Sequence, residues 1–289
     1  MVEELKKKLI EVQRTELTEY YTYKKLAEHE KNPENRAILN EIAEDELRHY
    51  KFWEKQTGIA VRHSGFLVMI YYVISRVLGL TFTIKLMEHK EQGAQVNYQE
   101  IAREIPEASE IEADENAHEQ KLIGMINEER LHYIGSVVLG LNDALVELTG
   151  TLAGLSLSLR NSRLVAVAGL ITGIAASLSM AASEYLSTKS EKTSVKNPVR
   201  ASVVTGTAYV ATVFVLILPF LLLTNTVVAL GLTLVTVLMI IACFTYYISV
   251  THDLSFSRKF AEMAGISVAV AMITFLIGYF IQRFWNIEV

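Results

Sequence analysis

Cysteine is nearly absent from this chain, since Cys243 is the only one in 289 residues. A single cysteine excludes an intrachain disulfide and any zinc site built from several cysteine ligands. Because Cys243 lies in an apolar run, we expect it to pack as a small buried hydrophobic side chain. Any metal site in this protein must then be built from other ligands.

A basic stripe is missing too, and the charge is divided unevenly along the chain. Residues 1–133 contain 18 Lys and Arg against 25 Asp and Glu, a net charge of −7, whereas residues 134–289 contain 9 against 7, a net charge of +2. Binding to nucleic-acid phosphates needs clustered basic residues, so no nucleic-acid partner is expected. The acidic first half favours cations as partners.

The first residues lack the pattern of a signal peptide, which is a short apolar core followed by a cleavage site. The chain opens instead with Glu3, Glu4 and the basic run Lys6–Lys8 on an amphipathic pattern. We therefore expect the amino-terminal domain to stay in the cytoplasm.

Charge is absent from long stretches of the second half. The range Ala201–Val250 has no charged residue and is long enough for two membrane spans, since one span needs about 20 apolar residues. Pro219 and the cluster Thr224–Thr226 mark the turn between these two spans. Three more spans are expected at His132–Leu159, Leu164–Ser183 and Met263–Gln282. The sequence therefore predicts five spans.

The basic residues between the predicted spans are distributed asymmetrically. Those on one side are Lys189, Lys192, Lys196, Arg200, Arg258 and Lys259. Those on the other side are Arg160, Arg163 and Arg283. Because basic residues concentrate on the cytoplasmic side, we predict a multi-pass protein of the cell membrane with its N-terminus inside and its C-terminus outside.

Three acidic residues fall in or beside the predicted spans, namely Asp143, Glu147 and Glu184. Such groups cost a few kcal/mol in lipid unless they face a polar path or a partner. Asp143 and Glu147 are one helical turn apart on the same face, and Met180 offers a soft thioether that suits a transition metal. A plainer interpretation places Glu184 at the cytoplasmic end of its span and gives Glu147 a role in helix contacts.

Three short motifs in the first two predicted spans carry a family resemblance. They are Gly140–Ala144, Ala153–Leu155 and Ser179–Ser187. Residues 134–289 resemble the vacuolar iron transporter family, including its five spans. The resemblance implies that Asp143 and Met180 line the ion path of a homodimer that exchanges Fe(II) or Mn(II), with protons as the coupling ion in some members.

Two features differ from the plant-type members of that family. The segment Thr188–Val199 is too short for the Glu-rich cytosolic metal-binding insert of those members, and Ala144 stands where the family usually has glycine. Without the insert, the amino-terminal domain is expected to collect metal.

An E-x-x-H motif occurs three times in the first half, as Glu46 with His49, as Glu115 with His118 and as Glu129 with His132. Glu129 lies roughly 21 Å along a helix from Glu115, so the third match cannot join the same site and is set aside. The spacing puts carboxylate and imidazole on one helix face. Glu16 and Glu46 lie about 15 residues on either side of the Asn32–Pro33 turn, so an antiparallel hairpin brings them level. Two such helices and two helices with a single glutamate make a di-metal cage, whereas solvated acidic helix faces are the alternative.

The third liganding helix offers two candidates, Glu88 and Glu91, between which the sequence does not choose. With them, residues 1–130 resemble the ferritin-like superfamily and, more narrowly, the di-iron domain of rubrerythrin. The resemblance implies a di-iron centre, and the mixed carboxylate and imidazole ligands also suit manganese. A rubredoxin-like four-cysteine module is absent from the sequence, which argues against a complete rubrerythrin-type peroxidase.

The segment Phe66–Met87 carries only Arg76 and Lys85 as charged residues and is long enough to cross a bilayer. If it did so, Glu88 would lie at a membrane edge, away from Glu16, and the cage would be lost. We therefore predict that it is the third helix of the bundle, with a sixth span as the alternative.

Together, the two halves predict an all-α protein with a ferritin-like four-helix bundle in residues 1–130 and a five-helix transmembrane domain in residues 131–289. The whole chain resembles the erythrin-vacuolar iron transporter group, also called membrane-bound ferritins. This resemblance implies a transporter that exports Fe(II) or Mn(II) from the cytosol. The alternative is a di-iron oxidoreductase, such as a ferroxidase or peroxidase, whose spans are an anchor.

Overall fold

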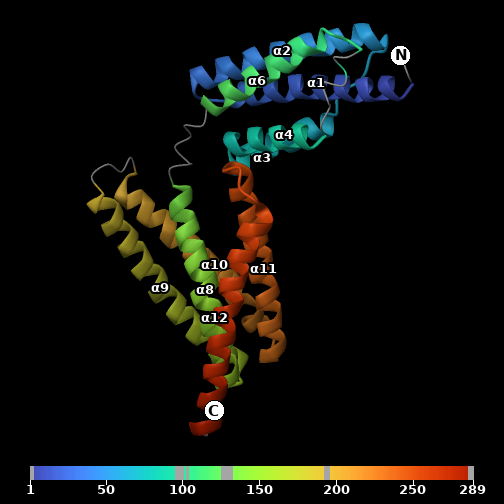
Figure 1. The fold of residues 1–289 in the computed structure, drawn as a ribbon. Helices are drawn as coiled ribbons and strands as arrows, with labels where there is room; N and C mark the ends of the chain where they lie inside the picture. The colour runs from blue at the N-terminus through green and yellow to red at the C-terminus, as the bar shows by residue number, and fades with distance from the viewer. Residues whose placement is uncertain (1–2, 95–100, 102–103, 125–132, 192–195, 286–289) are drawn as a thin grey trace. The chain divides into compact units, whose positions relative to one another are not determined.

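The computed structural model describes residues 3–94, 101, 104–124, 133–191 and 196–285 (Figure 1). These residues contain ten helices and no strand, which confirms the prediction of an all-α protein. The chain divides into two compact units, residues 1–128 and 129–289.

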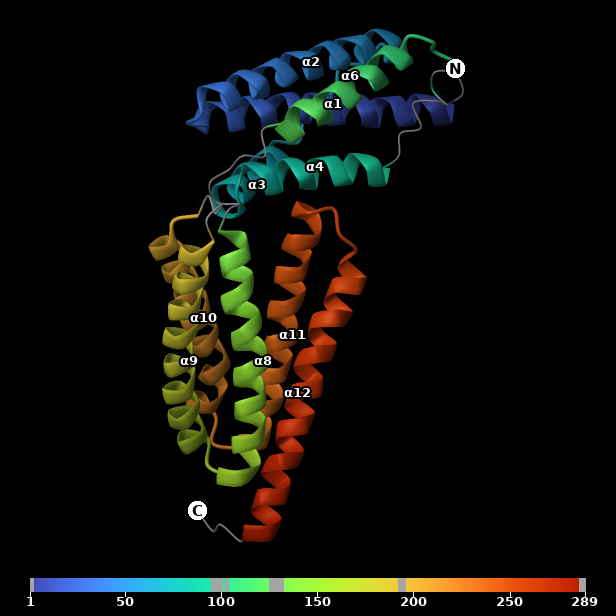
Figure 2. The same cartoon turned by 60° about the vertical axis from the view of Figure 1, so that its left-hand side comes forward.

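The first two helices of the amino-terminal unit form the predicted hairpin. Helix α1 (Glu3–His29) and helix α2 (Pro33–Thr57) are joined at Asn32, whose side chain accepts hydrogen bonds from the first backbone amides of α2. Asparagine at the N-cap and proline at the first position both favour a helix start. The two helices lie side by side (Figure 2).

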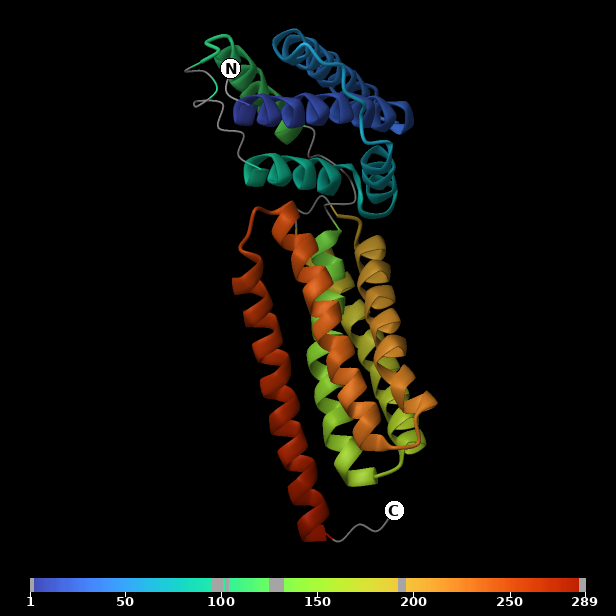
Figure 3. The same cartoon turned by 90° about the vertical axis from the view of Figure 1, so that its right-hand side faces the viewer.

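The predicted single helix over Phe66–Met87 is wrong, because the segment forms two helices. Helix α3 (Gly65–Leu78) and helix α4 (Leu80–Ala94) run in different directions (Figure 3). Between them Gly79 has φ 100° and ψ 160°, a backbone conformation that residues other than glycine rarely adopt. At 14 residues, α3 is also shorter than the roughly 20 residues of a membrane span.

Helix α6 (Ala108–Gly124) supplies the remaining described helix of this unit. The hydrophobic core takes residues from all five helices at helical spacing. Among its buried members are Tyr23, Leu26, Leu39, Ile42, Tyr71, Ile84, Met87 and Leu122. Because these apolar residues occupy one face of each helix, polar residues of α1, α2 and α6 on the other faces can form a site.

The second unit consists of five helices that are long and apolar enough to cross a membrane, as predicted. They are α8 (Ile134–Leu159), α9 (Ser162–Ser190), α10 (Pro198–Leu222), α11 (Thr226–Thr251) and α12 (Phe256–Trp285). Asn161, Asn197 and Asn225 cap the helices that follow them. The expectation that Pro219 marks a turn is wrong, because it lies inside α10. Figure 2 shows the five helices running side by side.

Glycines allow α8 to approach its neighbours closely. A Cβ atom on Gly140 would collide with the carbonyl oxygen of Thr205 in α10, and one on Gly278 of α12 would collide with that of Gly154. Small residues at such crossings allow membrane helices to pack by van der Waals contact. These contacts set how closely α8 packs against α10 and α12.

The expectation that Cys243 is buried is wrong, because its side chain is exposed on α11. In a membrane protein an apolar run does not imply an interior position, since the outer face of a span meets lipid. Cys243 belongs to that outer surface of the second unit.

Candidate metal centre

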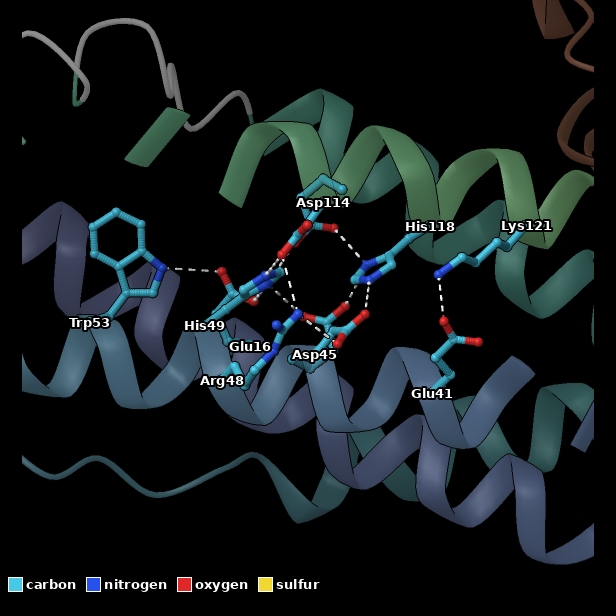
Figure 4. Close-up of polar contacts among 11 residues, drawn as sticks. Glu16, Glu41, Asp45, Arg48, His49, Trp53, Asp114, His118 and Lys121 are labelled. Carbon is cyan, nitrogen blue, oxygen red and sulfur yellow. Dashed lines mark hydrogen bonds and ion pairs between the residues drawn. The ribbon is translucent and has the colours of Figure 1, made fainter. Parts of the chain in front are cut away.

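Three helices of the amino-terminal unit bring four predicted ligands together, of which Figure 4 labels Glu16 and His49. Glu16 comes from α1, Glu46 and His49 come from α2, and Glu115 comes from α6. Each offers one ligand atom, and these atoms lie within 4.8 Å of one another. The hairpin brings Glu16 level with Glu46, and the three-residue spacing puts Glu46 and His49 on one face.

The Nδ1 atom of His49 faces carboxylates from three helices. It lies 3.1 Å from Oε1 of Glu115, 3.6 Å from Oε2 of Glu16 and 3.7 Å from Oε2 of Glu46. The separations of 3.6 and 3.7 Å are longer than a hydrogen bond, and all three fit donor atoms gathered around one ion. His49 is therefore at the centre of an acidic, buried site.

His118 completes the group from the other side. Its Nδ1 atom lies 3.4 Å from Oε1 of Glu46 and 3.6 Å from Oε2 of Glu115. Each of these glutamates thus directs one oxygen towards His49 and the other towards His118, whose rings are 5.9 Å apart. This is the arrangement by which two carboxylates can bridge a pair of cations.

Buried polar atoms of the cluster fit a cation. Oε2 of Glu46 and the Nδ1 atoms of His49 and His118 are buried and make no hydrogen bond. A buried polar atom that makes no hydrogen bond costs about 1–3 kcal/mol, which a coordinated ion would offset. Mixed carboxylate and imidazole donors suit Fe(II) and Mn(II).

The pKa shifts of the cluster also indicate that its buried carboxylates favour positive charge beside them. Burial alone would lower the pKa of His118, but the facing carboxylates raise it to about 10, and they raise that of His49 further. Burial opposes ionisation of Glu46, yet the imidazoles of His118 and His49 lower its pKa to about 2. Burial raises the pKa of Glu16. Bound cations would replace the protons as counter-charges.

Two aspartates that the sequence analysis missed hold the imidazoles in place. Asp114 of α6 lies 3.2 Å from Nε2 of His49, and Asp45 of α2 lies 3.0 Å from Nε2 of His118. Helices α2 and α6 thus each contribute an aspartate that contacts the histidine of the other helix. A carboxylate on one ring nitrogen fixes the tautomer and leaves the other nitrogen for a metal. The signal was present, because both motifs read D-E-x-x-H.

We expect Asp45→Asn and Asp114→Asn each to weaken metal binding about 10- to 100-fold, the usual cost of losing such an outer partner. Competition with a chelator of known affinity measures the change. Glu41→Gln is the matched control, because Glu41 joins the same two helices through an exposed ion pair with Lys121 at 2.8 Å. Equal affinity in all three variants would contradict the supporting role of the aspartates.

Of the two third-helix candidates, only Glu88 has a side chain in the described part of the chain. Glu88 lies on α4 with its carboxylate 3.5 Å from the Nζ atom of Lys85, and it is not among the four grouped ligands. Glu91 also belongs to α4, but its side chain lies outside the described part of the chain. Trp53 approaches the cluster from α2 and donates a hydrogen bond of 3.3 Å to Oε1 of Glu16.

In the second unit, two of the predicted carboxylates have partners that the sequence analysis missed. Glu147 of α8 accepts a hydrogen bond of 2.9 Å from the hydroxyl of Tyr209, a fully buried residue of α10. Glu184 of α9 is buried and accepts one of 2.6 Å from Ser136 of α8. A tyrosine in the middle of an apolar span was the available signal for the first pair.

Asp143 and Met180 are half-buried and lie between these two pairs along the helices. Asp143 is about 10 Å along α8 from Ser136, and Met180 is about 6 Å along α9 from Glu184. Because Ser136 bonds Glu184 and the two helices are antiparallel neighbours, Asp143 and Met180 differ in level by about 4 Å. The four predicted residues thus follow one another along the α8–α9 pair.

Five helices of span length define a multi-pass membrane protein, and its amino-terminal unit carries a Glu/His cluster that can hold a metal ion. Residues 134–197 match the model of the VIT family, the vacuolar iron transporters, whose members transport metal ions. This match confirms the predicted resemblance over that range. No curated protein and no solved structure matches the chain. The ferritin-like resemblance stays a prediction.

Proposed function

We propose that this protein transports Fe(II) or Mn(II) across the cell membrane and that its amino-terminal unit captures the same ions. The observation that carries the proposal is the VIT family match over residues 134–197. That range includes all four predicted path residues, Asp143, Glu147, Met180 and Glu184.

The order of groups along α8 and α9 supports a path for a divalent cation. An ion would pass from Glu184 to Met180 and Asp143, and then to Glu147. Steps of about one or two helical turns let it exchange one ligand at a time. Glu147 is exposed on a span, which is costly against lipid, so a second copy of the chain is expected to cover it.

The charge of the loops supports export from the cytosol, because it favours a cytoplasmic position for the amino-terminal unit that would capture the metal. The five helices alternate in direction, so the start of α8 shares one end of the unit with the α9–α10 and α11–α12 turns. Lys189, Arg200, Arg258 and Lys259 lie at this end, which the positive-inside rule makes cytoplasmic. Residues that precede α8 are then cytoplasmic, and protons are the proposed coupling ion.

The amino-terminal cluster would hold two ions. Glu16 and His49 would hold one, and His118 with a carboxylate of α4, Glu88 or Glu91, would hold the other. Glu46 and Glu115 would bridge the two, since each faces both imidazoles. Two bridged cations would balance the negative charge of the buried carboxylates.

Flux measurements on the full-length protein test the proposal. Proteoliposomes with a metal-sensitive dye inside should take up Mn(II), and Fe(II) under anaerobic conditions, faster than protein-free liposomes. Mg(II) should not be transported, because it prefers ligands that are all oxygen and dehydrates reluctantly. Flux equal to that of the protein-free liposomes would overturn the transporter proposal.

The burial of the cluster and the contact between Trp53 and Glu16 favour a second candidate function, a membrane-anchored di-iron oxidoreductase. Such centres oxidise Fe(II) with oxygen or peroxide. Stopped-flow absorbance of the iron-loaded protein distinguishes the two. Repeated turnover with ferric product supports catalysis, whereas binding without turnover supports capture.

A further inference from the structure

An apolar stripe is exposed along helix α3 of the amino-terminal unit. Its members are Phe66, Met69, Val73 and Val77, whose exposed fractions are 75%, 49%, 50% and 69%. The spacings of three and four residues put them on one helix face. A continuous apolar face of this kind on the surface of a polar unit marks an interaction site.

The opposite face fixes α3 to the rest of its unit. Val68 and Tyr71 are buried, and Tyr71 belongs to the same core as residues of α1. The ring of Tyr72 lies 4.7 Å from that of His29 and 5.1 Å from the Nζ atom of Lys25. The stripe therefore points away from the core and is held in place by α1.

The charge around the stripe is opposite to that of its unit. From Lys55 to Ile84 the chain carries three basic residues and no acidic one, although residues 1–133 have a net charge of −7. Arg62 and Arg76, near the two ends of α3, are exposed. An exposed apolar face flanked by arginines is typical of helices that lie in the interface of an anionic membrane.

We propose that α3 lies in the headgroup layer of an anionic lipid membrane, with its apolar stripe towards the acyl chains and its arginines at the phosphates. The helix is too short to span. Two copies joined stripe to stripe would bring like-charged arginines together without acidic partners, which disfavours self-association. The same chain crosses a membrane, so the lipid surface is always within its reach.

Fluorescent probes on the full-length protein in nanodiscs test this contact. In a Cys243→Ser background, Val73→Cys and Val77→Cys are labelled with an environment-sensitive dye, and the label on Lys51→Cys, an exposed position of α2, is the matched control. With phosphatidylglycerol present, we expect blue-shifted emission and quenching by acyl-brominated lipid at both stripe positions. The control label should respond only to aqueous iodide.

The charge contribution is tested by Arg62→Glu combined with Arg76→Glu, which should reduce the quenching by brominated lipid several-fold in anionic nanodiscs and little in purely zwitterionic ones. Iodide access at Val73 equal to that at Lys51 would overturn the proposal. Protection from both iodide and brominated lipid would also overturn it, because protein would then cover the stripe. Cross-linking between copies through Val73→Cys would then identify a second chain as the covering protein. None of these outcomes depends on whether the protein transports metal.

Discussion

Replacing Asp143 with alanine is expected to reduce metal flux through the reconstituted protein to the level of protein-free liposomes. Asp143 is half-buried in the first span, between the Ser136–Glu184 and Tyr209–Glu147 pairs. A cation that has lost its water ligands needs a charged ligand at this depth, because lipid tails cannot coordinate it. Removing the carboxylate should therefore raise the barrier for the ion at the middle of the path.

The same substitution should not destabilise the membrane unit. A carboxylate within a span costs free energy, so thermal unfolding of Asp143→Ala in detergent should occur at the same temperature or higher. Glu262→Ala is the matched control, since Glu262 forms an exposed ion pair with Lys259 at 3.0 Å and its loss should leave flux unchanged. Full transport by Asp143→Ala, measured with the dye-loaded proteoliposomes, would refute the proposed path.

Local signals in the sequence predicted most of the fold. The hairpin at Asn32 was predictable because the capping side chain and the following proline act on adjacent residues. The five spans were predictable because a long uncharged run has few alternatives to crossing a membrane. The break at Gly79 was not, because one glycine in an apolar run is compatible with a helix, and its φ depends on how α3 and α4 pack.

The candidate site divides in the same way. The spacing within one helix predicted that Glu46 and His49 share a face. The supporting contacts join different helices, as with Asp114 and His49. They depend on the register between those helices, which the residue spacing within one helix does not reveal. Tyr209 is a similar case, because its hydrogen bond to Glu147 requires α8 and α10 to pack at one particular level.

Removing a bridging glutamate is expected to cost both metal ions, whereas removing a terminal one should cost no more than one. Glu46 and Glu115 each face both imidazoles, while the imidazole described beside Glu16 is that of His49. Elemental analysis of the purified full-length protein should give about two ions per chain, near zero for Glu46→Ala and Glu115→Ala, and about one for Glu16→Ala.

Glu44→Ala controls for loss of a carboxylate from α2, because Glu44 is exposed and paired with Lys24 at 2.7 Å, away from the imidazoles. It should retain both ions. Glu46→Gln keeps the shape of the side chain and should still lose both, because a neutral amide cannot balance two cations. If Glu46→Ala and Glu16→Ala each kept one ion, the two metals would be bound independently, and the bridging role of Glu46 would be wrong.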